Sequence, residues 1–272
     1  MIIIGEKING SIPSAGKAIA ARDEAWIRNL AKIQSEANAD YIDCCASVNV
    51  DELETMEWLI GLIQDECDTP ICIDSPDPQV CVDAMKFCKK TGIINSVSLE
   101  GNKTDIVFPA IKDTKWGCVA LLCDDHGIPK TADKRIEIFE EILRRAKDSG
   151  IAPDRLYIDP LVETLGTNTK SLLTFAEVCR RIKEIEPDVH ITSGLSNISF
   201  GLPVRKMINQ SFMVLAMNAG MDSAIVDPTN RDMMGTIYAT AALLDEDFYC
   251  MEYIGHYCGN GCRCFVWIFE VQ

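Results

Sequence analysis

The segment Ile71-Cys-Ile-Asp-Ser-Pro-Asp-Pro78, followed by Gly92-Ile-Ile-Asn-Ser96, contains the unit on which the fold prediction depends. The short apolar run Ile71–Ile73 predicts a strand that is buried on both faces. Asp77 followed by Pro78 is typical of a helix start, with an N-cap and then proline in the first turn. Gly92 is expected to end that helix with a left-handed C-cap. Ile93–Ser96 then predicts the next strand, so the segment reads as one strand–helix–strand unit.

The same unit recurs from end to end. Strands are predicted at Ile2–Ile4, Tyr41–Cys45, Ile71–Ile73, Ile93–Ser96, Cys118–Cys123, Leu156–Ile158, His190–Thr192 and Ser223–Val226. Apolar residues at helical spacing lie between them, within Trp26–Ala37, Leu53–Ile63, Ile136–Ala146 and Leu172–Ile182. Asp51 with Glu54 resembles a capping box. Further left-handed C-caps are predicted at Gly117, Gly150 and Gly220.

Eight strands that are each followed by a helix predict a single-domain α/β protein, a (β/α)₈ TIM barrel. An open doubly wound sheet is the alternative, but eight regular units without a Gly-rich phosphate loop favour the closed barrel. The barrel is expected to span residues 1–250. Residues 251–272 do not continue the pattern and are expected to form a tail of uncertain structure.

Charge and composition exclude several kinds of partner. The chain has 272 residues, about the length of one barrel, and a formal net charge of −15. So acidic a surface repels phosphate backbones and anionic lipid, which argues against nucleic acid and membranes as partners. No apolar run approaches the length of a transmembrane helix. We therefore expect a cytoplasmic protein whose 13 cysteines are reduced, with most of them packed as small apolar side chains.

Polar residues follow the apolar strands at the end where a barrel of this class has its active site. Asp74, Asn95 and Asp159 each come directly after a strand. Any one of them could simply make a turn or cap a helix, but three together favour a ligand site. Carboxylates and carboxamides match a flat edge that carries adjacent N–H donors and a carbonyl, as a 2-amino-4-oxo pterin does. A phosphorylated ligand would instead call for Arg, Lys or a glycine-rich loop.

At these residues the sequence resembles the pterin-binding methyltetrahydrofolate:corrinoid-protein methyltransferases, which are related to dihydropteroate synthase and to the folate module of methionine synthase. The matching segments are Ile3–Gly10, Met56–Leu59, Cys72–Ser75, Ile94–Ser96, Leu156–Leu161, Gly194–Ser199 and Ala219–Ala224. They occur in order over about residues 1–250 and lie mostly at consecutive strand ends.

The resemblance implies a role for each matching residue. Asp74, Asn95 and Asp159 would hold the pterin edge. Asn197 would be the catalytic residue, hydrogen-bonded near N5 of tetrahydrofolate, the atom that carries the methyl group. Gly194 and Ser196 would line the pocket, with Arg205 close by. Phe200 departs from the family pattern, in which a polar Gln can stand at this position.

The resemblance also implies the activity and the partners. A methyl group would move between tetrahydrofolate and a corrinoid (cobalamin) carried by a separate corrinoid protein, in a direction that the sequence leaves open. Catalysis would rest on positioning and electrostatic stabilisation, with no metal on this chain. A homodimer is expected from the resemblance alone. Two alternatives stay open: a dihydropteroate synthase-type enzyme, and a non-catalytic folate-binding or corrinoid-docking subunit.

Three other features carry less weight. Asp124-Asp-His-Gly-Ile-Pro129 begins like the corrinoid-binding motif Asp-x-His-x-x-Gly, but proline replaces the glycine. The tail cysteines Cys258, Cys262 and Cys264 lack the paired spacing of a structural zinc site. The three methionines of residues 207–217 are expected to lie in the core: Met207, Met213 and Met217.

Overall fold

The computed structural model describes residues 1–46 and 51–257. The described chain forms one parallel sheet whose strand order is β7-β6-β5-β4-β3-β2-β1-β8. The strands are β1 (Ile2–Asn9), β2 (Tyr41–Cys45), β3 (Ile71–Asp74), β4 (Ile93–Leu99), β5 (Gly117–Asp124), β6 (Leu156–Asp159), β7 (His190–Ile191) and β8 (Ser223–Val226).

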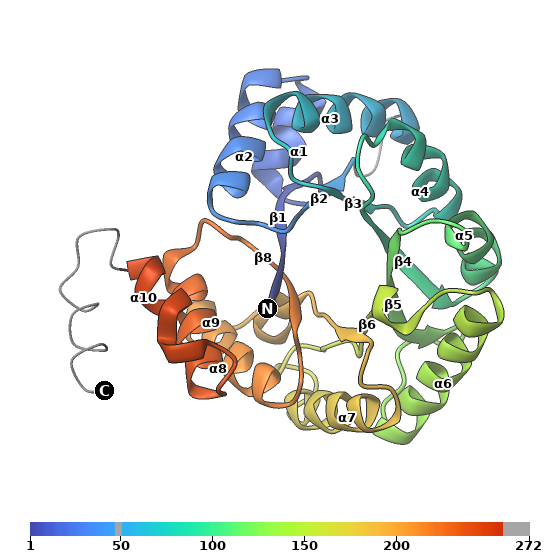
Figure 1. Ribbon diagram of the computed structural model, residues 1–272, viewed down its shortest axis with the longest axis vertical. Coiled ribbons are helices and arrows are strands. Elements are labelled where there is room, and N and C mark those ends of the chain that lie inside the picture. Colours follow the sequence, from blue (N-terminus) through green and yellow to red (C-terminus); the bar gives the residue numbers. More distant parts are fainter. Residues whose placement is uncertain (47–50, 258–272) are drawn as a thin grey trace.

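The first and last strands of the chain, β1 and β8, are paired, and contact between the two edge strands of the sheet, β7 and β8, closes it into a barrel. Ile2 of β1 is in register with Ser223 of β8. The remaining seam, between β7 and β8, is bridged by backbone hydrogen bonds from Asp222 N to the oxygen of Ile191 and from Ile225 N to the oxygen of Ser193, both 3.2 Å long. Figure 1 shows the resulting ring of strands inside a ring of helices. The predicted (β/α)₈ barrel is confirmed, and the open doubly wound alternative is wrong.

Helices connect successive strands around the outside of the barrel. They are α1 (Pro13–Ala20), α2 (Glu24–Glu36), α3 (Glu52–Glu66), α4 (Pro78–Ala84), α5 (Lys103–Ile111), α6 (Ala132–Asp148), α7 (Ser171–Ile185), α8 (Arg205–Asn218), α9 (Arg231–Leu243) and α10 (Met251–Tyr257). Short 3₁₀ turns are η1 (Met85–Phe87), η2 (Pro153–Arg155), η3 (Leu195–Ser199) and η4 (Phe248–Cys250). The described helices include none that is long and apolar enough to span a bilayer.

Helix starts follow the caps expected from the sequence. The Asp77 carboxylate accepts the backbone N–H of Gln79, and Pro78 occupies the first turn of α4. The Asp51 carboxylate accepts the N–H of Glu54 at the start of α3. The Glu54 carboxylate pairs with Arg22 instead of reaching back to complete a capping box.

Two of the four predicted glycine C-caps are wrong. Gly150 and Gly220 have the expected positive φ, of 76° and 105°, whereas Gly92 and Gly117 do not. Gly92 is required by a close approach: a Cβ at this position would lie 1.9 Å from the backbone oxygen of Ile71. Glycine therefore lets β4 start directly against β3.

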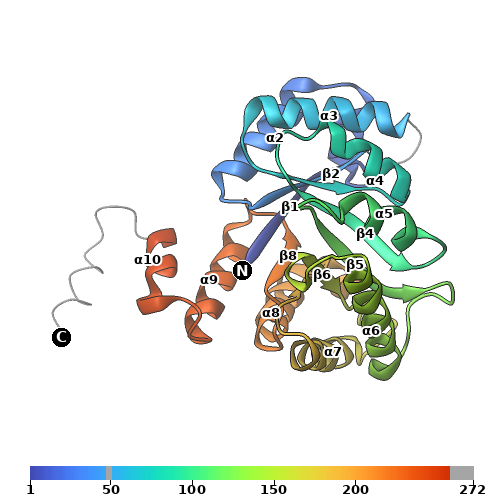
Figure 2. The ribbon, with the colours of Figure 1, turned by 45° about the vertical axis from the view of Figure 1, so that its right-hand side comes forward.

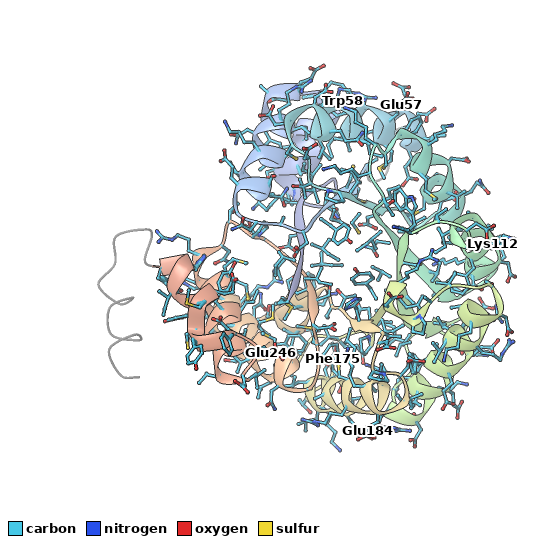
Figure 3. The ribbon with its side chains drawn as sticks, viewed as in Figure 1. Glu57, Trp58, Lys112, Phe175, Glu184 and Glu246 are labelled. Atoms are coloured by element: carbon cyan, nitrogen blue, oxygen red, sulfur yellow. The ribbon has the colours of Figure 1, made fainter. Side chains whose placement is uncertain are left out.

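Two apolar cores stabilise the barrel. The smaller one lies on the inward faces of the strands and contains Ile4, Cys72, Ile93, Val119 and Tyr157. The larger one lies between the strands and the helices. Figure 3 shows Phe175 of α7 in this layer and the charged side chains of Glu57, Lys112 and Glu184 on the outer rim.

The methionines of α8 are divided between the core and the surface. Met213 and Met217 are buried, as predicted. The prediction for Met207 is wrong, because its side chain is 62% exposed. An apolar residue at helical spacing therefore does not always lie on the covered face.

The chain leaves the barrel through α10, which packs against α9. The ring of His256 lies 4.5 Å from that of Tyr238, centroid to centroid. Figure 2 shows α10 beside α9, outside the ring of helices. Cys258, Cys262 and Cys264, which were considered as zinc ligands, lie outside the described residues.

The substitution Gly92→Ala tests the close approach of β3 and β4. We expect it to lower the free energy of unfolding by about 2–4 kcal/mol, because the backbone must shift to admit the methyl group. Urea unfolding monitored by circular dichroism measures this change. Gly61→Ala in α3 is the matched control: a Cβ there meets nothing within 4 Å, so a gain of about 0.5–1 kcal/mol is expected. Equal effects of the two substitutions would contradict the steric argument.

Candidate active site

The candidate pterin-binding residues occupy the inward positions directly above the inner apolar core. Side chains alternate between the two faces of a strand, so Asp74, Asn95 and Asp159 lie two residues beyond the core residues Cys72, Ile93 and Tyr157. Asp74 and Asn95 are in register on β3 and β4. Asp159 is in register with Leu121 of β5. All three therefore face the barrel axis at the carboxyl ends of their strands, although Asp159 is separated from Asn95 by β5.

An amide–carboxylate network joins the first four strands beneath the mouth. The Asn9 amide donates to a carboxylate oxygen of Asp74 over 3.2 Å and to one of Asp43 over 3.4 Å. The Asn95 amide donates to the other Asp43 oxygen over 3.4 Å. The peptide bond that follows Asn95 is cis. Asn9 and Asn95 thus clamp two carboxyl groups between β1 and β4.

Burial makes these carboxyl groups hard to ionise. Desolvation is the main cause that raises the pKa of Asp43 well above its usual value, and the neighbouring Asp74 raises it further. The pKa of Asp74 is raised to about 6, again chiefly by burial, and hydrogen bonds from Cys45 and Asn9 oppose that rise. Burial therefore disfavours the charged form of both carboxyl groups, and that of Asp43 more strongly, because the neighbouring Asp74 adds to the effect.

Asp159 is positioned by the segment that follows it, and Arg135 fixes that segment in turn. Its carboxylate accepts the backbone N–H of Leu161 over 2.8 Å, and burial raises its pKa to about 6. The guanidinium of Arg135, which is fully buried, donates to the backbone oxygens of Pro160 and Leu161 over 2.7 and 2.6 Å. Arg135 of α6 therefore fixes the loop that follows Asp159.

The remaining predicted residues lie on one turn above β7. Gly194 precedes η3, which carries Ser196 and the exposed Asn197. The Arg205 guanidinium donates to the backbone oxygen of Ser196 over 2.7 Å and to the hydroxyl of Ser199 over 3.0 Å. Arg205 therefore anchors the turn that presents Asn197. These four residues are close together, on the opposite side of the barrel from the Asp74–Asn95 pair.

Three site residues were not assigned a role from the sequence: Glu6, Asn9 and Asp43. Burial and the Asp227 carboxylate raise the pKa of Glu6 to about 7, and Lys7 and Arg205 oppose this rise. Glu6 and Asn9 lie in the polar end of β1, beyond the apolar run that predicted this strand. Residues two positions apart on a strand face the same side. Counting forward from Ile4 and back from Cys45 would therefore have identified Glu6 and Asp43 as inward-facing.

The described residues of the mouth were also compared with the side-chain groups that hold metal ions and corrinoids. Within residues 1–46 and 51–257, no cluster of three His, Cys, Asp or Glu side chains is arranged to hold a metal ion. His126 lies exposed in the turn after β5, where its backbone N–H donates to the Asp124 carboxylate. The mouth instead offers carboxylate and amide acceptors, amide donors and few cations, which suits a flat ligand edge rich in N–H groups.

This fold and this polar mouth are those of a pterin-binding barrel, and the chain belongs to the pterin-binding enzyme family, which it matches over residues 12–227. It is 51% identical to the methylcorrinoid:tetrahydrofolate methyltransferase of Eubacterium limosum, over 93% of this chain and 94% of that protein. It is 31% identical to the methionine synthase of Mycobacterium tuberculosis, over 85% of this chain but only 21% of that longer protein. The resemblance predicted from the strand ends is confirmed.

Solved structures agree on the fold. The dihydropteroate synthase of Xanthomonas albilineans in complex with 7,8-dihydropteroate superposes with a TM-score of 0.68 at 18% identity, over 89% of this chain and 93% of that one. The dihydropteroate synthase of Coxiella burnetii gives 0.64 at 16% identity, over 89% and 94%. At these identities the likeness concerns the barrel and not the reaction.

The raised pKa values predict a pH-dependent affinity for folate. A donor edge binds the ionised carboxylates, so the affinity should be complete above pH 7 and fall as Asp74 and Asp159 become protonated below about pH 6. We expect the dissociation constant of tetrahydrofolate to rise about tenfold for each of the two carboxylates, about 100-fold in all, between pH 7 and pH 5, measured by isothermal titration calorimetry.

Asp159→Asn should weaken binding at pH 7 and flatten this dependence, because the amide does not titrate. Asp188→Asn, at an exposed position outside the mouth, should leave both unchanged. A dissociation constant that stays the same from pH 5 to pH 7 in the unaltered protein would show that these carboxylates do not bind the ligand.

Proposed function

We propose that this chain is a methyltransferase that moves a methyl group from the cobalt of a protein-bound corrinoid to N5 of tetrahydrofolate. The observation that carries the proposal is the combination of the acidic-amide ring at the mouth with 51% identity, over nearly the whole of both chains, to a methylcorrinoid:tetrahydrofolate methyltransferase. The name of that relative also favours this direction of transfer, which the sequence alone left open.

The pterin edge is assigned to the three strand-end residues. Asp74 and Asp159 would accept the ring N–H and the exocyclic amine, and the Asn95 amide would pair with the ring carbonyl or a ring nitrogen. No lysine or arginine pairs with the Asp74 carboxylate among the described residues. The oxygens of this carboxylate can therefore accept hydrogen bonds from the N–H groups of a ligand.

Asn197 is assigned to the reacting end of the folate. N5 gains a bond to carbon in one direction and loses it in the other, so its charge changes along the reaction. A neutral carboxamide can follow that change with a hydrogen bond and without titrating. Its exposure on η3 leaves room for a corrinoid protein to approach N5 from above the mouth.

The corrinoid is a substrate in this proposal and arrives on a separate protein. The described cysteines form no disulfide, which fits a reducing interior and a cytoplasmic location. The alternative of a dihydropteroate synthase-type enzyme would need cations for a pyrophosphate. Arg205, at the start of α8, is already hydrogen-bonded to η3.

The proposal predicts a large loss of rate in Asn197→Ala. Mixing methylcobalamin with tetrahydrofolate should yield cob(I)alamin and methyltetrahydrofolate, followed anaerobically by absorbance, and the reverse mixture should yield methylcobalamin. We expect Asn197→Ala to lower the single-turnover rate by about 10²–10³-fold with a much smaller change in folate affinity.

Asn29→Ala on the outside of α2, at an exposed position, is the matched control and should retain full activity. If the unaltered protein transfers no methyl group in either direction, the chain is instead a non-catalytic folate-binding subunit.

We also propose that two copies associate through the outer face of α8. Met207 and Leu215, 62% and 47% exposed, line an apolar groove of about 280 Å³ between α7 and α8. Helix α8 contains no acidic residue, whereas the whole chain has 41 acidic and 26 basic residues. Two copies of so acidic a protein repel each other least where acidic residues are missing, so a second copy fits this face.

Met207→Glu should convert the dimer to a monomer by placing two carboxylates in the shared interface, as measured by light scattering after gel filtration. Leu243→Glu, on the exposed end of α9, is the control that should remain dimeric. A monomeric unaltered protein at micromolar concentration would contradict the dimer.

A further inference from the structure

A small polar cavity opens at the mouth between β1, η3, α8 and α9. It has a volume of about 60 Å³ and is lined by Glu6, Ser196, Asn209, Asp227 and Asn230 together with apolar neighbours. The side-chain oxygen of Asn209 is buried and has no hydrogen-bond partner among the described residues. A polar space of this size accommodates water, so it can connect the groups that line it.

Glu6 is the one group on this wall that is both acidic and free of a cation. Lys7 pairs with Asp227 over 3.1 Å, and Arg205 is bound to η3. Within residues 1–46 and 51–257, no cation lies within ion-pair distance of the Glu6 carboxyl. The charged groups that influence it are Asp227, Lys7 and Arg205, and the rise of its pKa to about 7 lets it hold or release a proton at physiological pH.

The proposed reaction releases a proton that such a group can accept. When the lone pair of N5 forms the bond to the methyl carbon, the cobalt–carbon bond breaks and leaves its electron pair on cobalt, which falls from Co(III) to Co(I). The proton that N5 carried must then leave. The Asn197 amide can accept or donate a hydrogen bond but cannot take up that proton, and Asp74 and Asp159 are assigned to the pterin edge.

We infer that Glu6 exchanges the N5 proton of the folate, through the cavity that it shares with Ser196 beside Asn197. This inference rests on the proposed methyl transfer. In the direction of folate methylation, the Glu6 carboxylate receives the proton and passes it to solvent. In the reverse direction, the carboxylic acid form of Glu6 returns the proton as the bond between N5 and carbon breaks.

The proton is assigned to Glu6 because the other carboxyl groups nearby are either paired with a cation or buried more deeply. Asp227 is neutralised by Lys7. Asp43 lies one layer deeper, in register with Cys72, and is 1% exposed. Glu6 is half-buried at the mouth itself, in the same cavity wall as the turn that carries Asn197.

The test is Glu6→Gln, which keeps the shape of the side chain and removes its acid–base function. Single-turnover rates are measured from pH 5.5 to 8.5 in both directions, with methylcobalamin plus tetrahydrofolate and with cob(I)alamin plus methyltetrahydrofolate. In the unaltered protein, folate methylation should speed up and the reverse reaction slow down as the pH rises through about 7. Glu6→Gln should lower both rates by about 100-fold or more and remove the pH dependence near 7, with folate affinity within about threefold.

Matched variants separate a catalytic role from a structural one. Glu57→Gln on the outer face of α3 (Figure 3) should retain the rates and the pH profile of the unaltered protein. Glu6→Asp keeps a titrating carboxyl and should retain a pH-dependent rate, which decides the matter if Glu6→Gln does not fold. Circular dichroism and thermal unfolding report on folding of each variant.

The outcomes distinguish this inference from the proposed function. A Glu6→Gln variant with the unaltered rate, or with a lower rate but the same pH profile, overturns the role of Glu6 and leaves the methyltransferase intact. Loss of folate affinity in parallel with the rate also overturns it, because Glu6 would then only shape the site. If the unaltered protein transfers no methyl group in either direction, the proposed function itself has failed.

Discussion

Closure of the parallel sheet is the constraint on which the site depends. In a closed barrel every second residue of each strand faces the axis, so the interior fills in layers. Ile4, Cys72, Ile93, Val119 and Tyr157 pack such a layer. Two residues further towards the carboxyl ends, the inward-facing positions are occupied by acids and amides. No further layer of apolar side chains covers them among the described residues. The apolar layer therefore forms the floor of the candidate site.

The same floor explains why the carboxyl groups hold their protons so strongly. An acid that is buried without a cation pays for ionisation by losing its hydration, and burial is the first cause of the raised pKa at Asp43, Asp74, Asp159 and Glu6. Lysine or arginine partners would have lowered these pKa values and occupied the acceptor oxygens. Amides such as Asn9 stabilise the network with single hydrogen bonds instead. The acceptors then remain available to a ligand that supplies N–H donors.

Much of this arrangement could be predicted from the sequence, because the pattern of apolar runs locates the strand ends and the barrel brings strand ends together. Asp74, Asn95 and Asp159 were found in this way. The partnership of Asn9 with Asp43 could not be, since it depends on the register between strands and on a bulge in β1 between Gly5 and Ile8. Gly92 was expected for its backbone conformation and is needed for close packing. Met207 was expected in the core because it is apolar and lies at helical spacing from other apolar residues. That spacing identifies an apolar face of a helix but does not show whether another element covers it.

The two halves of the mouth are built differently, and this difference bears on the reaction. From β1 to β4, side chains clamp one another across strands, so in the proposed reaction a pterin edge would meet a preorganised surface. From β6 to β8, Arg135 and Arg205 instead fix, through backbone oxygens, the loop that follows Asp159 and the turn that carries Asn197.

The loop half also leaves Asn197 open to solvent, and Phe200, where the family pattern can have Gln, is 68% exposed on the same turn. Hydrogen bonds to a developing charge are strongest where water is excluded, and the part of the chain that the structure describes leaves Asn197 exposed to water. In the proposed reaction, the docking corrinoid protein must therefore supply the cover, and the exposed ring of Phe200 offers it an apolar contact at the rim. Substrate delivery and the completion of the site would then be one event, so that folate bound alone remains unreactive until its methyl donor or acceptor arrives.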